Sequence, residues 1–148
     1  MLTHISIQHE DFDIADEIDA LTRADADIGA VVTFSGLVRG DGGLSAMTLE
    51  HYPGMTEREI ARHIAEAETR WPLLGVTVIH RVGRLDPGQR IVLVAVASSH
   101  RGAAFEAAEF LMDYLKTRAP FWKLEERGGH TAWVDAKHGD DDAAKRWR

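Results

Sequence analysis

The segment from Ile91 to Lys123 constrains the fold more than any other part of this sequence. Its first part, Ile91 to Ala97, is an uninterrupted apolar and β-branched run, which is typical of a buried strand. Apolar side chains then recur at helical spacing from about His100 to Arg118, and Pro120 cannot continue a helix. The segment therefore predicts a sheet with a helix packed against it, and we expect Ser98-Ser99 to cap that helix.

The same patterns predict the other elements of the chain. Alternating or β-branched apolar residues indicate strands near 5–7, 28–38 (a buried one), 44–52, 76–82, 121–124 and 131–136. Helical spacing indicates two more helices, at 14–21 and 56–71. The pair Gly128-Gly129 is typical of a hairpin turn. We therefore expect an α+β fold in which strands, paired mostly as hairpins, are covered by three main helices.

Composition limits the class of protein. No repeat, linker or low-complexity stretch interrupts the chain, so one domain should span residues 1–148, with 139–148 as a charged tail. No apolar run approaches the roughly 20 residues of a membrane span. The first residues lack the pattern of a signal peptide, so we expect a cytoplasmic protein.

Three features of the sequence argue against further classes of chemistry. The chain has no cysteine, which rules out disulfides, thiolate metal sites and a cysteine nucleophile. Its net charge of −7 argues against a general nucleic-acid binder, because such binding needs many phosphate contacts. The eight histidines are scattered and no His-Glu-x-x-His motif occurs, so we expect no metal site.

Basic residues gather around the predicted third helix. His100 and Arg101 stand at its N-terminus, where free backbone N–H groups favour an anion. Lys116 falls on its last turn and Lys123 on the strand after Pro120, so the corner can aim both amines into one cleft. The alternative is structural: Arg101 pairs with a surface acid, Lys116 satisfies the helix dipole, and Lys123 is an ordinary strand residue.

A glycine-rich loop after Arg39 is a second candidate. Such a turn exposes backbone N–H groups and can hold a phosphate, although this one lacks the Gly-x-x-x-x-Gly-Lys-Ser/Thr pattern. On physical grounds alone a mobile hairpin loop is the default interpretation.

Five stretches of the sequence are distinctive, namely VVTFSGLVR (31–39), LEHYPGM (49–55), VIHRVG (78–83), HR (100–101) and MDYLKTRAPFWK (112–123). Through them the chain resembles the MoaE family, the catalytic (large) subunit of molybdopterin synthase, from about Ile28 to Trp147. The resemblance implies an α/β hammerhead-type fold with an additional antiparallel sheet. It also implies an enzyme that converts cyclic pyranopterin monophosphate to molybdopterin by inserting two sulfurs as a dithiolene.

The resemblance further implies a partner. The sulfur arrives as a thiocarboxylate on the C-terminal Gly-Gly of a small ubiquitin-like subunit, so the enzyme is a sulfurtransferase with no permanently bound cofactor. Two large subunits form a homodimer with one small subunit at each end, a heterotetramer. A sulfur-transferring chain without cysteine must receive its sulfur on another molecule, which agrees with this arrangement.

The family's functional positions fall on basic residues of this chain, namely Arg39, His100, Arg101, Lys116 and Lys123. Further residues of the same segments are expected to line the site, namely Leu37, Val38, Leu124 and Glu125. Lys137 stands where the family often has arginine, which keeps the charge but loses the bidentate fork.

On this resemblance Lys116 is the main catalytic residue, as a general acid/base or as a transient amine partner of the thiocarboxylate. Lys123 serves catalysis by binding substrate and stabilising charge, while Arg39, His100 and Arg101 hold the phosphate and the pterin. Two alternatives remain open. One is a lysine-dependent lyase acting on another phosphorylated ring compound, and the other is a module that binds a Gly-Gly tail without chemistry.

Overall fold

The computed structural model describes residues 1–23, 25–134, 142 and 144–147. The helices are α1 (Ile14–Thr22), α2 (Met55–Arg70) and α3 (Arg101–Thr117), with a short 3-10 turn, η1 (Asp41–Gly43). The strands are β1 (Leu2–Gln8), β2 (Ala30–Leu37), β3 (Leu44–His51), β4 (Gly75–Arg81), β5 (Gly83–Leu85), β6 (Arg90–Ser98), β7 (Phe121–Arg127) and β8 (His130–Val134). The predicted helices are confirmed to within about one residue.

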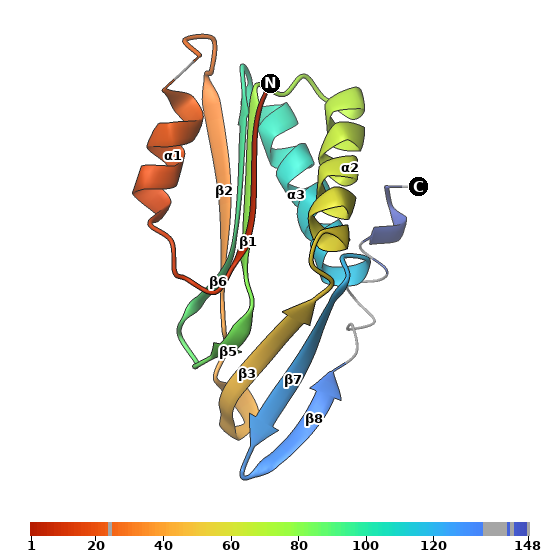
Figure 1. Cartoon of the computed structure of the whole chain (residues 1–148). Coiled ribbons are helices and arrows are strands. Elements are labelled where there is room, and N and C mark those ends of the chain that lie inside the picture. Colours follow the sequence, from red (N-terminus) through yellow and green to blue (C-terminus); the bar gives the residue numbers. More distant parts are fainter. Residues whose placement is uncertain (24, 135–141, 143, 148) are drawn as a thin grey trace.

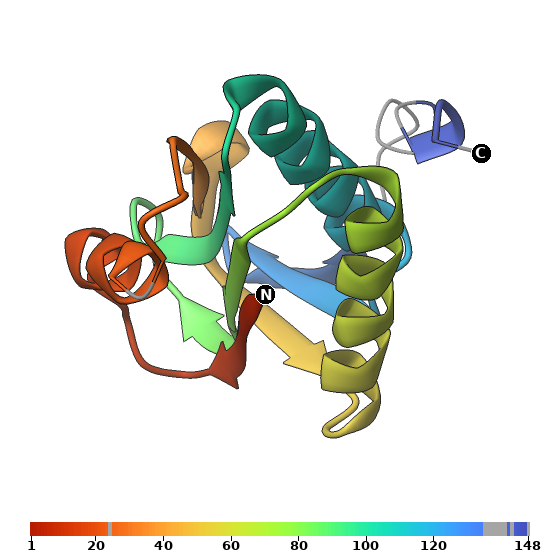
Figure 2. The same ribbon diagram turned by 90° about the horizontal axis from the view of Figure 1, so that it is seen from above.

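The strands form two four-stranded sheets, in the orders β1-β4-β6-β2 and β5-β3-β7-β8. All pairs are antiparallel except β1 and β4, which run parallel and are connected through α1, β2, β3 and α2. Figure 1 shows α2 and α3 on one face of the first sheet and α1 on the other, with the second sheet extending beyond the helices. The view from above shows the same layers (Figure 2). The α+β fold with three helices and an additional antiparallel sheet is confirmed.

The core lies on both faces of the central strands β4 and β6. Val94 and Val96 of β6 pack in the main core with Ala104 and Leu111 of α3. The intervening residues of β6, such as Leu93, point to the opposite face, which α1 covers. This two-sided burial explains why the sequence of β6 is continuously apolar.

The start of α3 differs from the prediction. His100, not a serine, is the N-cap residue, and its side chain makes no capping hydrogen bond. The fully buried hydroxyl of Ser98 instead donates a hydrogen bond to the carbonyl oxygen of Pro72, at 2.7 Å. Ser98 therefore ties the end of β6 to the loop after α2, so the prediction that Ser98-Ser99 caps α3 was wrong.

Strand β2 also differs, because we expected it to be buried. It lies at the edge of the first sheet and pairs only with β6. Phe34 is 39% exposed and Leu37 is 56% exposed, so two apolar side chains of this strand face outward. An apolar, β-branched sequence does not by itself distinguish an edge strand from a central one.

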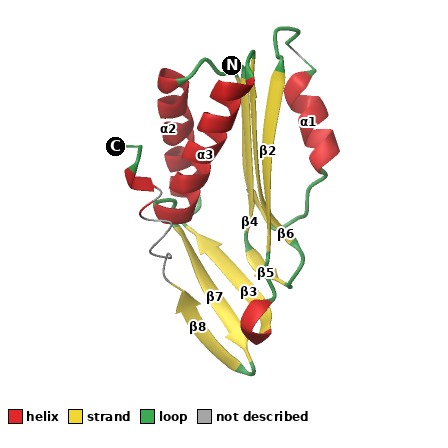
Figure 3. Cartoon of the chain, turned by 180° about the vertical axis from the view of Figure 1, so that it is seen from behind, coloured by secondary structure: helices red, strands yellow, loops and turns green. Residues whose placement is uncertain are grey.

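The second sheet ends in the hairpin of β7 and β8. Gly128 and Gly129 form its turn with φ values of 53° and 80°, the left-handed conformation that a two-residue hairpin turn requires. Seen from behind, β7 follows directly from the end of α3 (Figure 3). The described part of the chain contains no helix with both the length and the apolar character needed to cross a membrane.

Candidate active site

The end of α3 and the start of β7 form the predicted corner. Backbone N–H groups of Arg118 and Ala119 both donate to the carbonyl oxygen of Tyr114, at 2.8 and 3.2 Å, which closes the last turn of the helix before Pro120. Lys116 is exposed on that last turn, and Lys123 is half-buried on β7. The prediction that the two lysines flank a helix–strand corner is confirmed.

Both lysines line one hollow of about 840 Å³, which we call the lysine groove. This volume lies within the range of small-molecule sites. The groove lies between the edge strand β2, the second sheet and the end of α3. Its apolar walls include the exposed Phe34 and Leu37 together with Met112 and Trp122.

Three more of the predicted site residues line the lysine groove. They are Leu37, Arg39 and Glu125. Arg39 lies 3.4 Å from the carboxylate of Asp41 (Nε to Oδ1), and Glu125 lies 3.3 Å from Arg127 (Oε1 to Nη2). Each of these two acidic residues of the groove thus has a basic neighbour.

The remaining predicted residues lie elsewhere. Val38 is buried in the core at the end of β2, and Leu124 lies on the face of β7 opposite to Lys123. Lys137 and residues 139–141, 143 and 148 of the predicted tail lie outside the described residues.

His100 and Arg101 do not reach the lysine groove of the same chain. They are exposed at the N-terminal end of α3, whereas Lys116 is at its C-terminal end. Lys116 lies fifteen positions after Arg101 along the helix, which corresponds to about 22 Å along the axis. One chain therefore carries two basic clusters at opposite ends of one helix.

His80 is a groove residue that the sequence analysis treated only as part of a strand. It lies near the end of β4, is 8% exposed and lines the lysine groove. Its ring stacks on Phe121 with a centroid distance of 4.0 Å. In the sequence, the position of this histidine among the alternating valines of β4 is the feature that could have indicated a groove residue.

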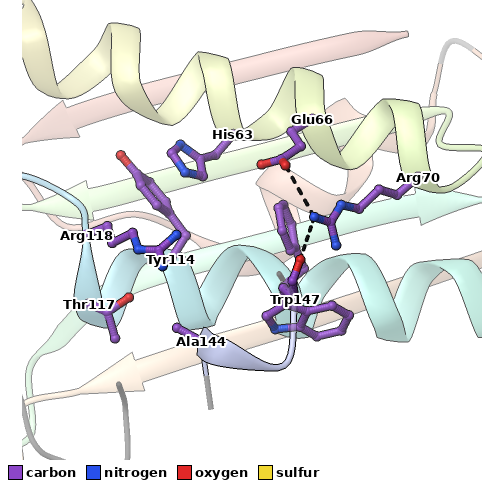
Figure 4. A pocket seen from close by; sticks show the side chains of 9 residues that line it. His63, Glu66, Arg70, Tyr114, Thr117, Arg118, Ala144 and Trp147 are labelled. Atoms are coloured by element: carbon purple, nitrogen blue, oxygen red, sulfur yellow. Dashed lines mark hydrogen bonds and ion pairs between the residues drawn. The ribbon is translucent and has the colours of Figure 1, made fainter. Parts of the chain in front are cut away.

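A second, smaller hollow of about 270 Å³ lies between α2, α3 and the end of the chain. Figure 4 shows the Arg70 guanidinium between Glu66 and the backbone carbonyl of Trp147, and His63 beside Tyr114. None of the predicted site residues lines this hollow. Among the described residues, no three histidine or carboxylate side chains are grouped so that they could hold a metal ion.

Comparisons with known sequences match the chain to one protein family. The family profile described as "MoaE protein" matches residues 7–118. A molybdopterin synthase catalytic subunit from Mesorhizobium japonicum is 63% identical over 147 residues, covering 97% of this chain and 92% of that protein.

Solved structures give the same result. The MoaE protein of Burkholderia ambifaria is 51% identical, with a TM-score of 0.87, and the match covers 99% of this chain and 98% of that one. Molybdopterin synthase from Staphylococcus aureus is 30% identical, with a TM-score of 0.78, covering 88% of this chain and 95% of that one. A complex of subunits 1 and 2 of the molybdopterin-converting factor from Helicobacter pylori has the same fold, at 20% identity and a TM-score of 0.71, covering 93% of this chain and 92% of that one.

Proposed function

This chain belongs to the MoaE family of molybdopterin synthase catalytic subunits, and on that premise we propose that it converts cyclic pyranopterin monophosphate to molybdopterin. The reaction inserts two sulfurs as a dithiolene. Each sulfur comes from a thiocarboxylate at the C-terminal Gly-Gly of a small ubiquitin-like subunit. The partner proposal draws support from the Helicobacter pylori protein, which was solved as a complex of two subunits.

The observation that carries this proposal is the lysine groove. It combines two amines and the guanidinium of Arg39 with apolar and aromatic walls, in a chain whose net charge is −7. A substrate with a phosphate and a heterocyclic ring fits such a lining, because the amines attract the phosphate and Trp122 and Phe34 offer apolar contacts to the ring. The C-terminal thiocarboxylate of the partner is also an anion and is drawn to the same end.

The corner gives the two lysines different positions. Lys116 is exposed on the helix end, where it can meet the tail of the partner, and we assign it as the general acid/base or transient amine. Lys123 is half-buried on a strand that is paired on both sides, so it is held more firmly and suits substrate binding and charge stabilisation. Arg39 adds charge at the loop side of the groove.

His100 and Arg101 enter this proposal through a second copy of the chain. Because about 22 Å of helix separates Arg101 from Lys116 in one chain, both can touch one substrate only if two chains contribute. In a homodimer that places the start of one α3 beside the groove of its partner, Arg101 can bind the phosphate at the groove of the other chain. The exposed apolar side chains of the edge strand β2 and the exposed Phe105 near the start of α3 provide surface for such a contact.

Reconstitution tests the reaction. The protein is mixed with cyclic pyranopterin monophosphate and a partner carrying a C-terminal thiocarboxylate, and molybdopterin is measured after oxidation to a fluorescent pterin. We expect product with the thiocarboxylate and none with the same partner ending in a carboxylate. We also expect none after removal of the two terminal glycines, although the truncated partner should still bind. Consumption of the precursor without a dithiolene product would favour the lyase alternative.

Substitution of the groove lysines tests their roles. Lys116→Ala should abolish product formation in a folded protein, because an exposed helix-end lysine contributes little to stability. Lys123→Ala should raise KM for the precursor more than it lowers kcat. Lys145→Ala is the matched control, since Lys145 pairs with Asp142 at 3.6 Å away from the groove. Near-parental activity of Lys116→Ala would contradict the assignment.

A further inference from the structure

Arg127, the last residue of β7, contacts the glycine-rich loop of residues 40–43. Its Nη1 donates a hydrogen bond to the backbone carbonyl oxygen of Asp41, at 2.5 Å, although the two residues are 86 positions apart in the chain. Its Nη2 donates a hydrogen bond to the carboxylate of Glu125, at 3.3 Å, on the same face of β7. One guanidinium therefore links the loop to a strand that lines the lysine groove.

The turn between β5 and β6 contacts the start of the same loop. The backbone N–H of Gly88 donates a hydrogen bond to the carbonyl oxygen of Val38, at 2.7 Å, just before the loop begins. A Cβ on Gly40 would lie 3.0 Å from Pro87, so the backbone of the loop runs close to this turn. The start of the loop is thus held by backbone contacts, and its later part is held by the side chain of Arg127.

Gly42 leaves the space that the guanidinium of Arg127 occupies. A Cβ at this position would lie 2.5 Å from Nη1 of Arg127, which is too close for a non-bonded contact. Gly42 has a φ of 63° and Gly43 a φ of 76°, but a Cβ on Gly43 would meet no atom within 4 Å. The left-handed backbone therefore favours glycine at both positions, whereas the contact with Arg127 requires it only at Gly42.

Asp41 connects Arg127 to Arg39. The carbonyl oxygen of Asp41 accepts the hydrogen bond from Arg127, and its carboxylate forms an ion pair with Nε of Arg39, at 3.4 Å. The side chain of Arg39 lines the lysine groove and is 69% exposed, so the position of its guanidinium depends on the loop and on Asp41. A guanidinium carries five N–H donors, and a contact at Nε is compatible with a bidentate contact from the Nη atoms to a phosphate.

We infer that Arg127 is a positioning residue of the lysine groove: it fixes the loop at Asp41 and thereby holds Arg39 where it can bind an anionic group of the substrate. An isolated exposed ion pair would contribute little to such order. Arg127 instead joins two elements through two hydrogen bonds, one of them a short charge-assisted bond to a backbone carbonyl. The effect on substrate binding rests on the proposed function, whereas the order of the loop does not.

Backbone dynamics test this role without substrate. The ¹⁵N relaxation of the amides of residues 40–43 reports their order, and Arg127→Ala should lower their order parameters from about 0.85 to below about 0.6. Arg84→Ala is the matched control, because Arg84 pairs with Glu126 (Nε to Oε2, 3.1 Å), whose side chain lies on the other face of β7. This control should leave the order of the loop unchanged. Equal order of the loop in Arg127→Ala and in the parental protein overturns the inference.

Kinetics test whether Arg127 acts through Arg39. In the reconstituted reaction, Arg127→Ala should raise KM for the precursor about fivefold with a smaller change in kcat, because a lost charge-assisted hydrogen bond weakens substrate binding indirectly. In an Arg39→Ala background, the same substitution should change KM less than about twofold. In a Glu125→Gln background it should keep its full effect. Additive effects of Arg127→Ala and Arg39→Ala, or loss of the effect with Glu125→Gln, overturn the inference.

The two glycines of the loop provide a steric test. Gly42→Ala should displace the guanidinium of Arg127 and raise KM about as much as Arg127→Ala does, whereas Gly43→Ala, with similar backbone strain, should raise KM less. In a chain that already carries Arg127→Ala, the two glycine substitutions should have equal effects. A larger effect of Gly42→Ala that persists without Arg127 would contradict the inference.

These outcomes also separate the inference from the proposed function. A loop of unchanged order in Arg127→Ala, together with a raised KM in Arg39→Ala, overturns the inference alone. A loop that loses order in Arg127→Ala, together with an unchanged KM in Arg39→Ala, overturns the proposed role of Arg39 and with it the effect of Arg127 on substrate binding.

Discussion

Mixing two inactive variants should restore activity if each site needs residues from two chains. One variant is Lys116→Ala, which removes the amine at the C-terminal end of α3. The other is Arg101→Ala, which removes the guanidinium at its N-terminal end. Loss of one charged hydrogen bond costs about 1.5–3 kcal/mol, so Arg101→Ala should lower kcat/KM roughly 10- to 100-fold when the precursor is limiting.

The expected recovery follows from the geometry. In a mixed dimer, one groove lacks both groups, while the other combines the intact Lys116 of one chain with the intact Arg101 of its partner. Random exchange of equal amounts makes half of the dimers mixed, so about one quarter of all sites are complete. If both groups served the groove of their own chain, no complete site would form.

The assay compares kcat/KM for the two variants alone, mixed without exchange, and mixed after exchange by coexpression or by refolding together. A second mixture provides the control, in which a chain carrying both substitutions is combined with the parental chain. Shared sites predict about one quarter of the parental sites, whereas sites confined to one chain predict about one half. Activity after exchange that is no higher than in the unexchanged mixture, together with one half in the control, would refute the two-chain site.

Packing and burial predict the effects of three further substitutions on the stability of the fold. A Cβ on Gly29 would overlap the backbone carbonyl oxygen of Ser99, so Gly29→Ala should lower the free energy of unfolding in urea by about 2 kcal/mol. Gly102 lies in α3 with open space around it, so Gly102→Ala should raise this free energy by up to about 1 kcal/mol. Equal effects of the two substitutions would contradict the contact at Gly29. The pKa of His80 is about 4 in the folded protein, below its ordinary value of 6.5, so the unfolded chain binds the proton first as pH falls. The free energy of unfolding should therefore decrease by about 3 kcal/mol at most between pH 6.5 and pH 4, and it should depend less on pH in His80→Leu. The same pH dependence in both proteins would show that His80 is not its cause. Trp147 packs edge-on against two aromatic rings at 5.6 Å, so Trp147→Ala should lower the free energy of unfolding by about 1–2 kcal/mol, and an unchanged urea midpoint would show that this contact contributes nothing.

The spacing of apolar residues predicted the helices and strands well, because the packing of these elements in the core determines both the spacing and the burial. The stripe of α3 and the uninterrupted apolar run of β6 are both consequences of packing in the main core, and both were visible in the sequence. The parallel pairing of β1 with β4 was not visible, because strand neighbours that are distant in the chain leave no local pattern. The edge position of β2 escaped for the same reason.

The candidate site was predicted in part. The corner of Lys116 and Lys123 follows from Pro120, whose effect on the helix is local. The separation of Arg101 from Lys116 also follows from local structure, because a helix between them fixes their distance, although their shared positive charge suggests a single cluster. His80 escaped because a histidine within alternating valines was counted as part of the strand, while its stacking on Phe121 depends on the second sheet.

The length of α3 limits where insertions and deletions can be tolerated in this protein. One inserted residue within the helix turns everything beyond it by about 100° and advances it by 1.5 Å, so Lys116 would rotate out of its groove while Arg101 stayed in place. No shift elsewhere compensates, since the same insertion also displaces the apolar stripe from the sheet. The turn at Gly128-Gly129 neither positions the two basic clusters nor packs an apolar stripe on the first sheet. Insertions and deletions that retain activity should therefore accumulate at the tip of the hairpin and be absent from residues 102–116.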